Sequence, residues 1–263
     1  MSGYVGAMAT ASLNQKAIAQ AASLLVAARR TGKLIGALPA AAKPANADDA
    51  QAIQEATAAA LGEKIGGWKV GLPVDGQLFR GAIMASLIFD SPARIPAKLA
   101  PMLGVEAEIA FRFDRDLPAA RRDYTRDEVA AAVTAFPAIE VVATRFADYA
   151  TTPMLDRAAD CVSNGAFVRG KPVASWRKFD LSKIEVTLTI GGKEVVRQLG
   201  GHGAGDPILP AVALVNRFRH GAGVKAGLVM TTGTYTGLNI AKPDQTVVAA
   251  FTGFGSAEAR FTA

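Results

Sequence analysis

Residues 104–111 read GVEAEIAF, a largely apolar stretch that contains two glutamates. Its alternation of residue types predicts a β-strand, because successive side chains of a strand point to opposite faces. Glu106 and Glu108 then share one face, roughly 7 Å apart at their roots, while the residues between and beyond them can enter a core on the other face. Two carboxylates at this spacing repel each other unless water screens them or a cation lies between them. The stretch therefore predicts either a solvated strand face or part of a metal site.

A third glutamate bears on the choice between these two interpretations. If the face is solvated, Arg112 on the same face would be the partner of both carboxylates, because sheets with one wet face are common. Glu140, however, lies in the run PAIEVVAT (137–144), where apolar neighbours leave little polar face. Three carboxylates without a neighbouring histidine or cysteine suit a hard cation that prefers oxygen ligands, such as Mg²⁺ or Mn²⁺.

The rest of the chain predicts an α+β protein. Apolar spacing indicates a helix at residues 12–30 and a second helix from the N-cap Asn46 to about Gly62. After Gly67, strand-like segments separated by turn signals are expected at 68–71, 86–89, 105–113, 139–143, 184–190, 228–232 and 247–252. Further helices are expected at about 126–135, 152–160 and 207–220. We therefore expect a small helical N-terminal region, residues 1–65, followed by a mixed or antiparallel β domain, residues 66–263.

Composition places the chain among ordinary globular proteins. Of its 263 residues, 50% are hydrophobic and 20% are charged, which is close to average usage. No apolar run approaches the roughly 20 residues that a membrane-spanning helix needs, and the first residues do not resemble a signal peptide. Cys161 is the lone cysteine, which excludes a disulfide framework within the chain. These features predict a cytoplasmic protein without a membrane partner.

The formal charge of +6 raises the question of a nucleic-acid partner. The basic residues nevertheless occur as scattered pairs without interleaved aromatic residues, such as Arg29-Arg30, Arg121-Arg122 and Arg177-Lys178. Attraction of small anionic metabolites explains the same charge balance. We therefore expect no nucleic-acid partner.

Three further stretches carry polar residues that either catalysis or ordinary structure can explain. Lys69 in GGWKVGL is either a surface residue or a partly buried amine whose pKa is lowered by desolvation and a nearby cation. Asp156 and Asp160 in DRAADCVSNG are one helical turn apart, and a capped surface helix would explain them equally well. The threonines around Gly233 in VMTTGTYTG either bind a carboxylate or belong to the end of a strand, where threonine is favoured by its β-propensity.

Two other features predict no chemistry. The segment GGHGAGDP (200–207) lacks the Lys-Ser/Thr pair and the glycine spacing of a phosphate-binding loop. His202 and His220 form no recognisable triad with Cys161. Both histidines are therefore expected to be structural or exposed.

The order of these pieces resembles the 2-keto-4-pentenoate hydratase and 4-oxalocrotonate decarboxylase group of the fumarylacetoacetate hydrolase superfamily. The resemblance rests on WKVGL, LF (78–79), VEAEIAF, RDLP (115–118), PAIEVV, RFADY (145–149), DRAAD followed by SNG, and a late TTG. It spans about residues 66–263, and the N-terminal helices fit it as well.

This resemblance implies the mixed β-roll fold of the family. It also implies a homo-oligomer, since such enzymes are often built from pentamers. It implies a Mg²⁺ or Mn²⁺ ion held by Glu106, Glu108 and Glu140. It also implies an acid/base role for Lys69 and catalytic positions for Asp160 and Ser163. The substrate contacts that it implies come from Leu78, Phe79, Arg145, Thr232 and Gly233.

The activity implied by the resemblance is hydration of 2-hydroxypenta-2,4-dienoate-like acids to 4-hydroxy-2-oxo acids in aromatic catabolism. Decarboxylation of 2-oxo-3-hexenedioate (4-oxalocrotonate) is the alternative, because the two reactions share the same catalytic parts. A second alternative is an inactive or basic binding module on the same fold. The intact glutamates and Lys69 argue against that module.

Overall fold

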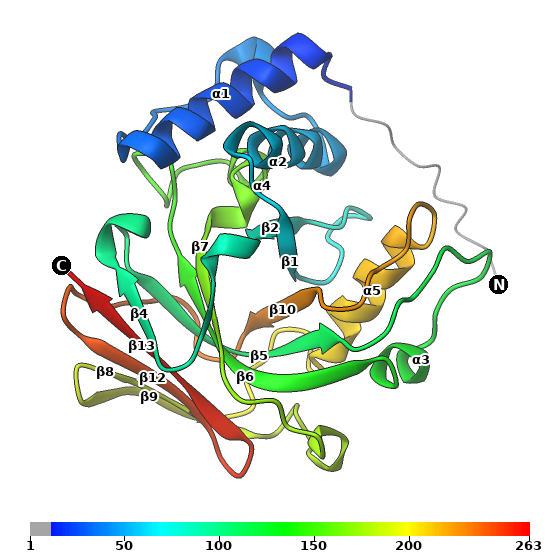
Figure 1. Cartoon of the computed structure of the whole chain (residues 1–263), viewed down its shortest axis with the longest axis vertical. Helices are drawn as coiled ribbons and strands as arrows, with labels where there is room; N and C mark the ends of the chain where they lie inside the picture. The colour runs from blue at the N-terminus through cyan, green and yellow to red at the C-terminus, as the bar shows by residue number, and fades with distance from the viewer. Residues whose placement is uncertain (1–11) are drawn as a thin grey trace.

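The computed structural model describes residues 12–263, which form two β-sheets with helices packed around the larger one (Figure 1). The larger sheet has the strand order β2 (Arg80–Met84), β1 (Ile65–Val70), β10 (Val229–Thr234), β5 (Gly104–Phe113), β6 (Val133–Val142), β7 (Asn164–Arg169) and β3 (Ile88–Asp90), and β11 (Asn239–Ile240) also pairs with β5. The smaller sheet has the order β4 (Ala93–Pro96), β13 (Gly255–Thr262), β12 (Thr246–Phe251), β8 (Glu185–Ile190) and β9 (Lys193–Leu199). The α-helices are α1 (Gln15–Thr31), α2 (Ala47–Leu61), α3 (Arg126–Ala130), α4 (Met154–Ala159) and α5 (Ile208–Phe218).

The antiparallel pair β5 and β6 forms the centre of the larger sheet (Figure 1). Each strand has 10 residues, and Glu106 lies directly opposite Glu140. On the other face of β5, the apolar residues predicted to enter a core are fully buried: Val105, Ala107, Ile109 and Phe111. They belong to one hydrophobic cluster with residues of the smaller sheet. The alternation in β5 thus directs apolar side chains into the main core and the glutamates to the opposite face.

The two N-terminal helices pack against each other and form a second core. Both begin after an asparagine N-cap, Asn14 for α1 and Asn46 for α2, and both end at a glycine with φ near 72°. Glycine adopts this left-handed conformation without strain, which explains why helices so often end there. The apolar faces of α1 and α2 pack with Phe146 and with the alanines of α4. The helical region therefore shares its core with a segment of the expected β domain.

Gln54 of α2 connects this helical region to the larger sheet. Its side-chain amide donates hydrogen bonds to the carbonyl oxygens of Arg80 (2.8 Å) and Ala158 (2.6 Å). Its amide oxygen accepts a hydrogen bond from the backbone N–H of Ala82 (2.7 Å), and the residue is only 1% exposed. The buried side chain of Gln54 thus joins α2 to β2 and to α4. The expected domain boundary near residue 65 stays a prediction.

We predict that Gln54→Leu lowers the free energy of unfolding by roughly 2–5 kcal/mol, because it leaves buried backbone polar groups without partners. Urea unfolding followed by circular dichroism measures the change. Gln51→Leu on the same helix is the matched control, since the Gln51 amide bonds only to Glu55 within α2 in the described part of the chain. The control should cost about 1 kcal/mol or less. Equal losses in the two variants would contradict the connecting role of Gln54.

The expected helix at 126–135 is wrong in its second half. α3 ends at Ala130, and β6 already begins at Val133. Pro137 concealed this long strand in the sequence, because proline is rare inside central strands. The structure accommodates it because β7 pairs with β6 only from Ala138 onward.

Other elements were partly missed. The expected strand at 86–89 is a short 3₁₀ turn followed by β3, and the sequence did not predict β2, β4, β7, β9 or β13. β2, β4, β7 and β9 are short, fully buried or rich in charged residues, so they lack the long alternation that revealed β5. β13 does alternate, with Ala257, Ala259 and Phe261 buried, but this pattern was not recognised in the sequence. The short 3₁₀ elements are Ala40–Ala42, Ala85–Leu87, Ala97–Leu99, Cys161–Ser163 and Trp176–Lys178.

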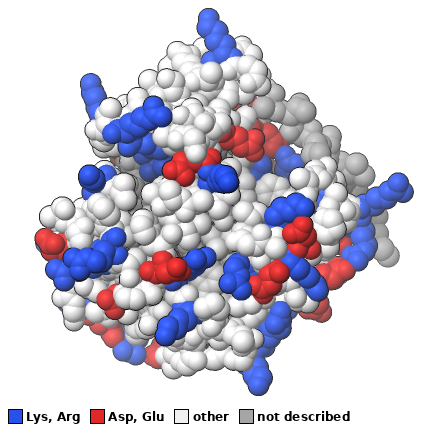
Figure 2. Space-filling view, in the orientation of Figure 1, with Lys and Arg blue, Asp and Glu red and all other residues white. Residues whose placement is uncertain are grey.

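The surface agrees with the scattered charge pattern of the sequence. On the face shown in Figure 2, lysine and arginine side chains are interspersed with aspartate and glutamate. Several are paired, as in Arg122–Glu128 (2.5 Å) and Arg197–Glu194 (2.6 Å). Within residues 12–263, no helix combines the length and apolarity needed to cross a membrane.

Candidate active site

The strand order of the larger sheet brings the predicted chemical residues together. Lys69 on β1 lies opposite Thr231 on β10, and β10 pairs in turn with β5. Glu106 and Glu108 of β5 and Glu140 of β6 complete the group. One carboxylate oxygen from each glutamate lies within 4.8 Å of the others, and the Lys69 ammonium is 2.6 Å from Glu140 Oε1.

The solvated-face interpretation of the E-A-E pattern is wrong. Glu108 and Glu140 are buried, with exposures of 1% and 0%, and Glu106 is half-buried. Arg112, the expected partner of the glutamates, instead pairs with Asp114 at 2.8 Å. The surface alternative for Lys69 is also wrong, because its side chain is only 17% exposed.

Neighbouring donors hold two of the carboxylates in place. Glu108 Oε2 accepts hydrogen bonds from the Thr231 hydroxyl and from the backbone N–H of Gly233 (3.0 Å). Glu140 Oε1 accepts one from the Asn164 side-chain amide at 3.2 Å. Glu140 Oε2 is buried and has no hydrogen-bond partner within the described residues.

These observations fit a divalent cation. Three converging carboxylate oxygens form an anionic donor set of the kind that Mg²⁺ and Mn²⁺ prefer. A buried carboxylate oxygen without a partner is costly unless it coordinates a cation. Coordination of a metal ion would therefore explain the buried Glu140 Oε2, for which no described residue supplies a partner.

The electrostatics of the cluster reflect its burial. Burial, followed by the negative charge of Glu140, raises the pKa of Glu106 to about 7. The same two causes raise the pKa of Glu108 well above its ordinary value. Burial alone would lower the pKa of Lys69, but the charge of Glu140, followed by those of the other two glutamates, raises it above its ordinary value. The expected lowering of that pKa required a nearby cation, which would reduce the charge of the carboxylates.

Lys69 and the three glutamates line a pocket of about 280 Å³. The other walls are mostly apolar and come from Val70, Gly71, Leu72, Val74, Phe79, Met154, Val162, Gly233 and Thr234. Two of the predicted substrate contacts, Phe79 and Gly233, are thus in the wall. Leu78 packs against the main core, and Thr232 is buried with its hydroxyl 3.3 Å from the carbonyl oxygen of Ile109. The predicted contact of all four residues with substrate stays a prediction.

Asp160, which is not in the lining of this pocket, is held by two arginines. Its Oδ1 accepts hydrogen bonds from Arg145 Nε (2.5 Å) and Arg29 Nη2 (3.2 Å), and its side chain is fully buried. The capped surface helix is therefore the wrong interpretation of this stretch. Arg145 also donates from Nη2 to the carbonyl oxygens of Asp160 and Asn164, both at 3.0 Å. No sequence pattern predicted the contact of Arg29 with Asp160, because the two residues are 131 positions apart.

A left-handed turn connects Asp160 to the pocket. Its residues Cys161, Val162 and Ser163 have φ of 55°, 49° and 57°, values that cost on the order of 1–3 kcal/mol for a residue other than glycine. Val162 projects into the pocket wall, and the buried Ser163 hydroxyl has no hydrogen-bond partner in the described range. The turn packs closely against β2, because a Cβ on Gly81 would lie 2.2 Å from the Cys161 carbonyl oxygen.

His202 is buried and makes hydrogen bonds through both ring nitrogens. Its Nδ1 accepts a hydrogen bond from the backbone N–H of Ala204 (3.2 Å), so Nε2 is the nitrogen that donates to the carbonyl oxygen of Thr232 (3.1 Å). The ring also packs against Tyr235. Thr231 and Asn164 are the site residues whose contacts with the glutamates sequence reasoning missed, because both contacts join different strands.

The family model described as fumarylacetoacetate (FAA) hydrolase C-terminal matches residues 56–262. The chain belongs to the fumarylacetoacetate hydrolase family. The membership expected from the order of motifs is thereby confirmed.

Curated relatives in this family carry two names. Proteins named 2-keto-4-pentenoate hydratase from Paraburkholderia phymatum and Burkholderia vietnamiensis are both 32% identical to the chain. The matches cover 92% and 95% of this chain and 96% and 99% of the two relatives. A 4-oxalocrotonate decarboxylase from Pseudomonas putida is 26% identical over 51% of each chain.

Solved structures of the fumarylacetoacetate hydrolase family have the same fold. The 4-oxalocrotonate decarboxylase from Pseudomonas putida G7, complexed with magnesium and adipate, matches with a TM-score of 0.83 at 21% identity, over 96% of this chain and 100% of that one. The fumarylpyruvate hydrolase from Pseudomonas aeruginosa, in complex with Mn²⁺ and pyruvate, matches with a TM-score of 0.55 at 13% identity, over 74% and 88%. These matches confirm the predicted fold type.

The raised glutamate pKa values predict a pH-dependent stability for the metal-free protein. Between the ordinary value of 4.5 and about 7, folded Glu106 retains a proton that the unfolded chain has lost. The folded state binds more protons in this window, so the contribution of the cluster to stability falls as pH rises. We expect the Tm of protein stripped of metal to fall over this window because of the cluster, and added Mg²⁺ to stabilise the protein more at pH 7.5 than at pH 5, since protons compete with the cation.

Thermal unfolding across pH, with and without Mg²⁺, measures this effect. Glu106→Gln is the comparison variant, because it removes one titrating ligand, and its metal-free Tm should depend less on pH. A wild-type Mg²⁺ stabilisation that is the same at pH 5 and pH 7.5 would contradict proton competition at the cluster.

Proposed function

We propose that the protein is a metal-dependent hydratase of 2-hydroxypenta-2,4-dienoate-like acids, producing 4-hydroxy-2-oxo acids. The observation that supports it most is the convergence of Glu106, Glu108 and Glu140 with Lys69 in the lining of a pocket whose other walls are mostly apolar. The names of the full-length relatives support the same activity.

In this proposal the three glutamates hold Mg²⁺ or Mn²⁺, and the ion supplies electrophilic stabilisation of negative charge on the substrate. The proposal includes either metal, since one structural neighbour is complexed with magnesium and another with Mn²⁺. Thr231, the Gly233 N–H and Asn164 orient Glu108 and Glu140. Oriented ligands keep the donor set in place when protons or substrate compete for it.

Lys69 is the residue best placed to move a proton. It is the only cationic side chain among the described residues that line the pocket, and its ammonium contacts Glu140. Protonation of the far carbon of a 2-hydroxydienoate produces an unsaturated ketone, to which water then adds at C4. We assign Lys69 the acid/base role in these transfers. We also propose the catalytic roles that the resemblance implies for Asp160 and Ser163, which lie on either side of Val162. The Ser163 hydroxyl is buried and has no hydrogen-bond partner among the described residues.

The apolar walls favour hydration over decarboxylation. Leu72, Val74, Phe79 and Met154 contribute apolar side chains to the lining, and such side chains suit an uncharged substrate tail. The decarboxylase alternative requires a distal carboxylate, which needs a cationic or hydrogen-bonding partner when buried. The observation in its favour is the fold match to a decarboxylase complexed with adipate, a dicarboxylate.

Assembly and location are further parts of the proposal. We propose a homo-oligomer located in the cytoplasm and acting on a small 2-oxo acid rather than on nucleic acid. The buried position of Cys161 is consistent with a reduced thiol. Size-exclusion chromatography with light scattering tests the oligomer, and a monomer would overturn that part.

Variants of Lys69 and of the glutamates should lose activity for different reasons. Glu108→Gln removes a charged ligand, so Mg²⁺ binding should weaken and excess Mg²⁺ should partly restore turnover. Lys69→Met keeps the apolar stem but removes the proton carrier, so turnover should fall by roughly 10²–10⁴ while Mg²⁺ and oxalate still bind. Titration calorimetry and steady-state kinetics on both variants measure the difference.

Lys64→Met is the matched control for Lys69→Met, because Lys64 precedes β1 and is exposed. It should retain wild-type turnover. If Lys69→Met also retains near wild-type turnover on the best substrate, Lys69 is not the proton carrier.

The substrate tail can be tested by comparing 2-hydroxypenta-2,4-dienoate with 2-oxo-3-hexenedioate. We expect hydration of the first, seen as loss of its ultraviolet absorbance without CO₂ release. Leu72→Arg adds a cation at an exposed position of the lining, and should raise relative kcat/KM for the dicarboxylate by roughly tenfold. Leu72→Gln is the uncharged control. Release of CO₂ from the second substrate by the wild-type protein, without hydration of the first, would favour the decarboxylase.

A further inference from the structure

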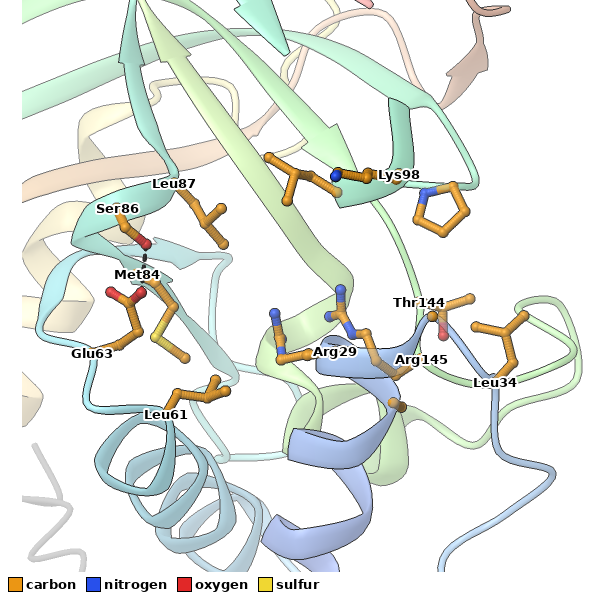
Figure 3. A pocket seen from close by; sticks show the side chains of 14 residues that line it. Arg29, Leu34, Leu61, Glu63, Met84, Ser86, Leu87, Lys98, Thr144 and Arg145 are labelled. Carbon is orange, nitrogen blue, oxygen red and sulfur yellow. Dashed lines mark hydrogen bonds between the residues drawn. The ribbon is translucent and has the colours of Figure 1, made fainter. Parts of the chain in front are cut away.

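A second pocket, of about 260 Å³, shares no lining residue with the glutamate pocket (Figure 3). Its walls come from the end of α1, the end of α2, the end of β2 with the 3₁₀ turn after it, the 3₁₀ turn Ala97–Leu99 and the segment that follows β6. Arg145, for which the family resemblance implied a substrate contact, lines this second pocket and not the glutamate pocket. None of the other residues assigned to the proposed hydratase activity lines it. Its volume is below the roughly 300–1,000 Å³ of pockets for drug-sized ligands, so it suits a smaller molecule.

Two guanidinium groups project into this pocket. Figure 3 shows Arg29 and Arg145 next to each other, with their charged ends directed into the space between the walls. Their side chains are only 12% and 7% exposed, and both contact the same carboxylate, that of Asp160. Two buried positive charges therefore share one negative charge.

The arginines leave hydrogen-bond donors unused. A guanidinium has five N–H donors, and Arg29 bonds to Asp160 through Nη2 at 3.2 Å. Arg29 Nε is buried and has no partner within residues 12–263. An unsatisfied buried donor is costly, and a carboxylate is the partner that a guanidinium binds best.

The remaining walls define the chemistry of the ligand. Lys98 is exposed at the pocket and has no ion pair in the described part of the chain, so it adds a third positive charge. Glu63, whose carboxylate accepts a hydrogen bond from the Ser86 hydroxyl (2.7 Å), supplies negative charge elsewhere in the lining. A ligand with a second negative charge would be repelled by Glu63, whereas the apolar walls suit a short hydrocarbon part.

We propose that this pocket is a binding site for a small monocarboxylate. Its carboxylate lies between Arg29, Arg145 and Lys98, and its short apolar part contacts Leu61, Met84 and Leu87. The site is separate from the metal cluster, so its occupancy does not require a bound metal or turnover.

Titration calorimetry on the full-length protein, stripped of metal with a chelating resin, tests the site. Metal removal excludes carboxylate binding through a cation at the glutamates. We expect propionate and pyruvate to bind saturably, with one molecule per chain, and the neutral analogue propionamide to bind roughly tenfold more weakly or not at all. Inorganic phosphate, which is largely a dianion at pH 8, should also bind more weakly than propionate. Failure of both monocarboxylates to bind would overturn the proposal, as would equal binding of propionamide.

Variants locate the binding. Arg29→Met should weaken propionate binding by roughly tenfold or more, whereas Arg30→Met, on the same helix but outside the lining, should change it less than about twofold. Lys98→Glu reverses an exposed charge without disturbing the core and should weaken binding by several-fold. Propionate affinity that is unchanged in Lys98→Glu and in folded Arg29→Met would place the carboxylate elsewhere and overturn the proposal.

Discussion

Glu106 lies opposite Glu140 because β5 and β6 pair in a register that the core enforces from their other face. Side chains alternate along a strand, so a shift of one residue would turn the glutamates into the core and the apolar residues toward the pocket. Ile109 and Phe111, both fully buried, make that shift costly. The position of the candidate metal ligands is thus set by hydrophobic burial rather than by attraction within the site.

The site itself works against folding. Three carboxylates and one ammonium are brought together with little water, and the raised pKa values of Glu106 and Glu108 express the resulting penalty. Natural proteins retain such locally unfavourable clusters mainly where chemistry requires them. Donors from β10 and β7 reduce the penalty at two of the carboxylates, but Glu140 Oε2 has no partner among residues 12–263. The second pocket has the opposite imbalance, with more positive charge than Asp160 alone can balance.

Local patterns predicted much of this molecule, and long-range contacts account for what they missed. The period of two in residues 104–111 was sufficient for β5 and for the shared face of its glutamates, and Asn46 was sufficient for the start of α2. The order of motifs predicted the family, and it placed Glu140 and Lys69 in the same predicted active site. Proline at 137 concealed the start of β6. The pairing of Asp160 with Arg29 could not be predicted, because no spacing rule connects residues 131 positions apart.

The left-handed turn at Cys161–Ser163 also constrains how this sequence can change. Its carbonyl at Cys161 occupies the space that any side chain at position 81 would need. A substitution of Gly81 is therefore tolerated only if the turn moves, and a moved turn displaces Val162 from the pocket wall. The two segments, 80 residues apart, form an epistatic pair. A homologue that lacks the glycine is expected to have a differently shaped pocket, even if all three glutamates are retained.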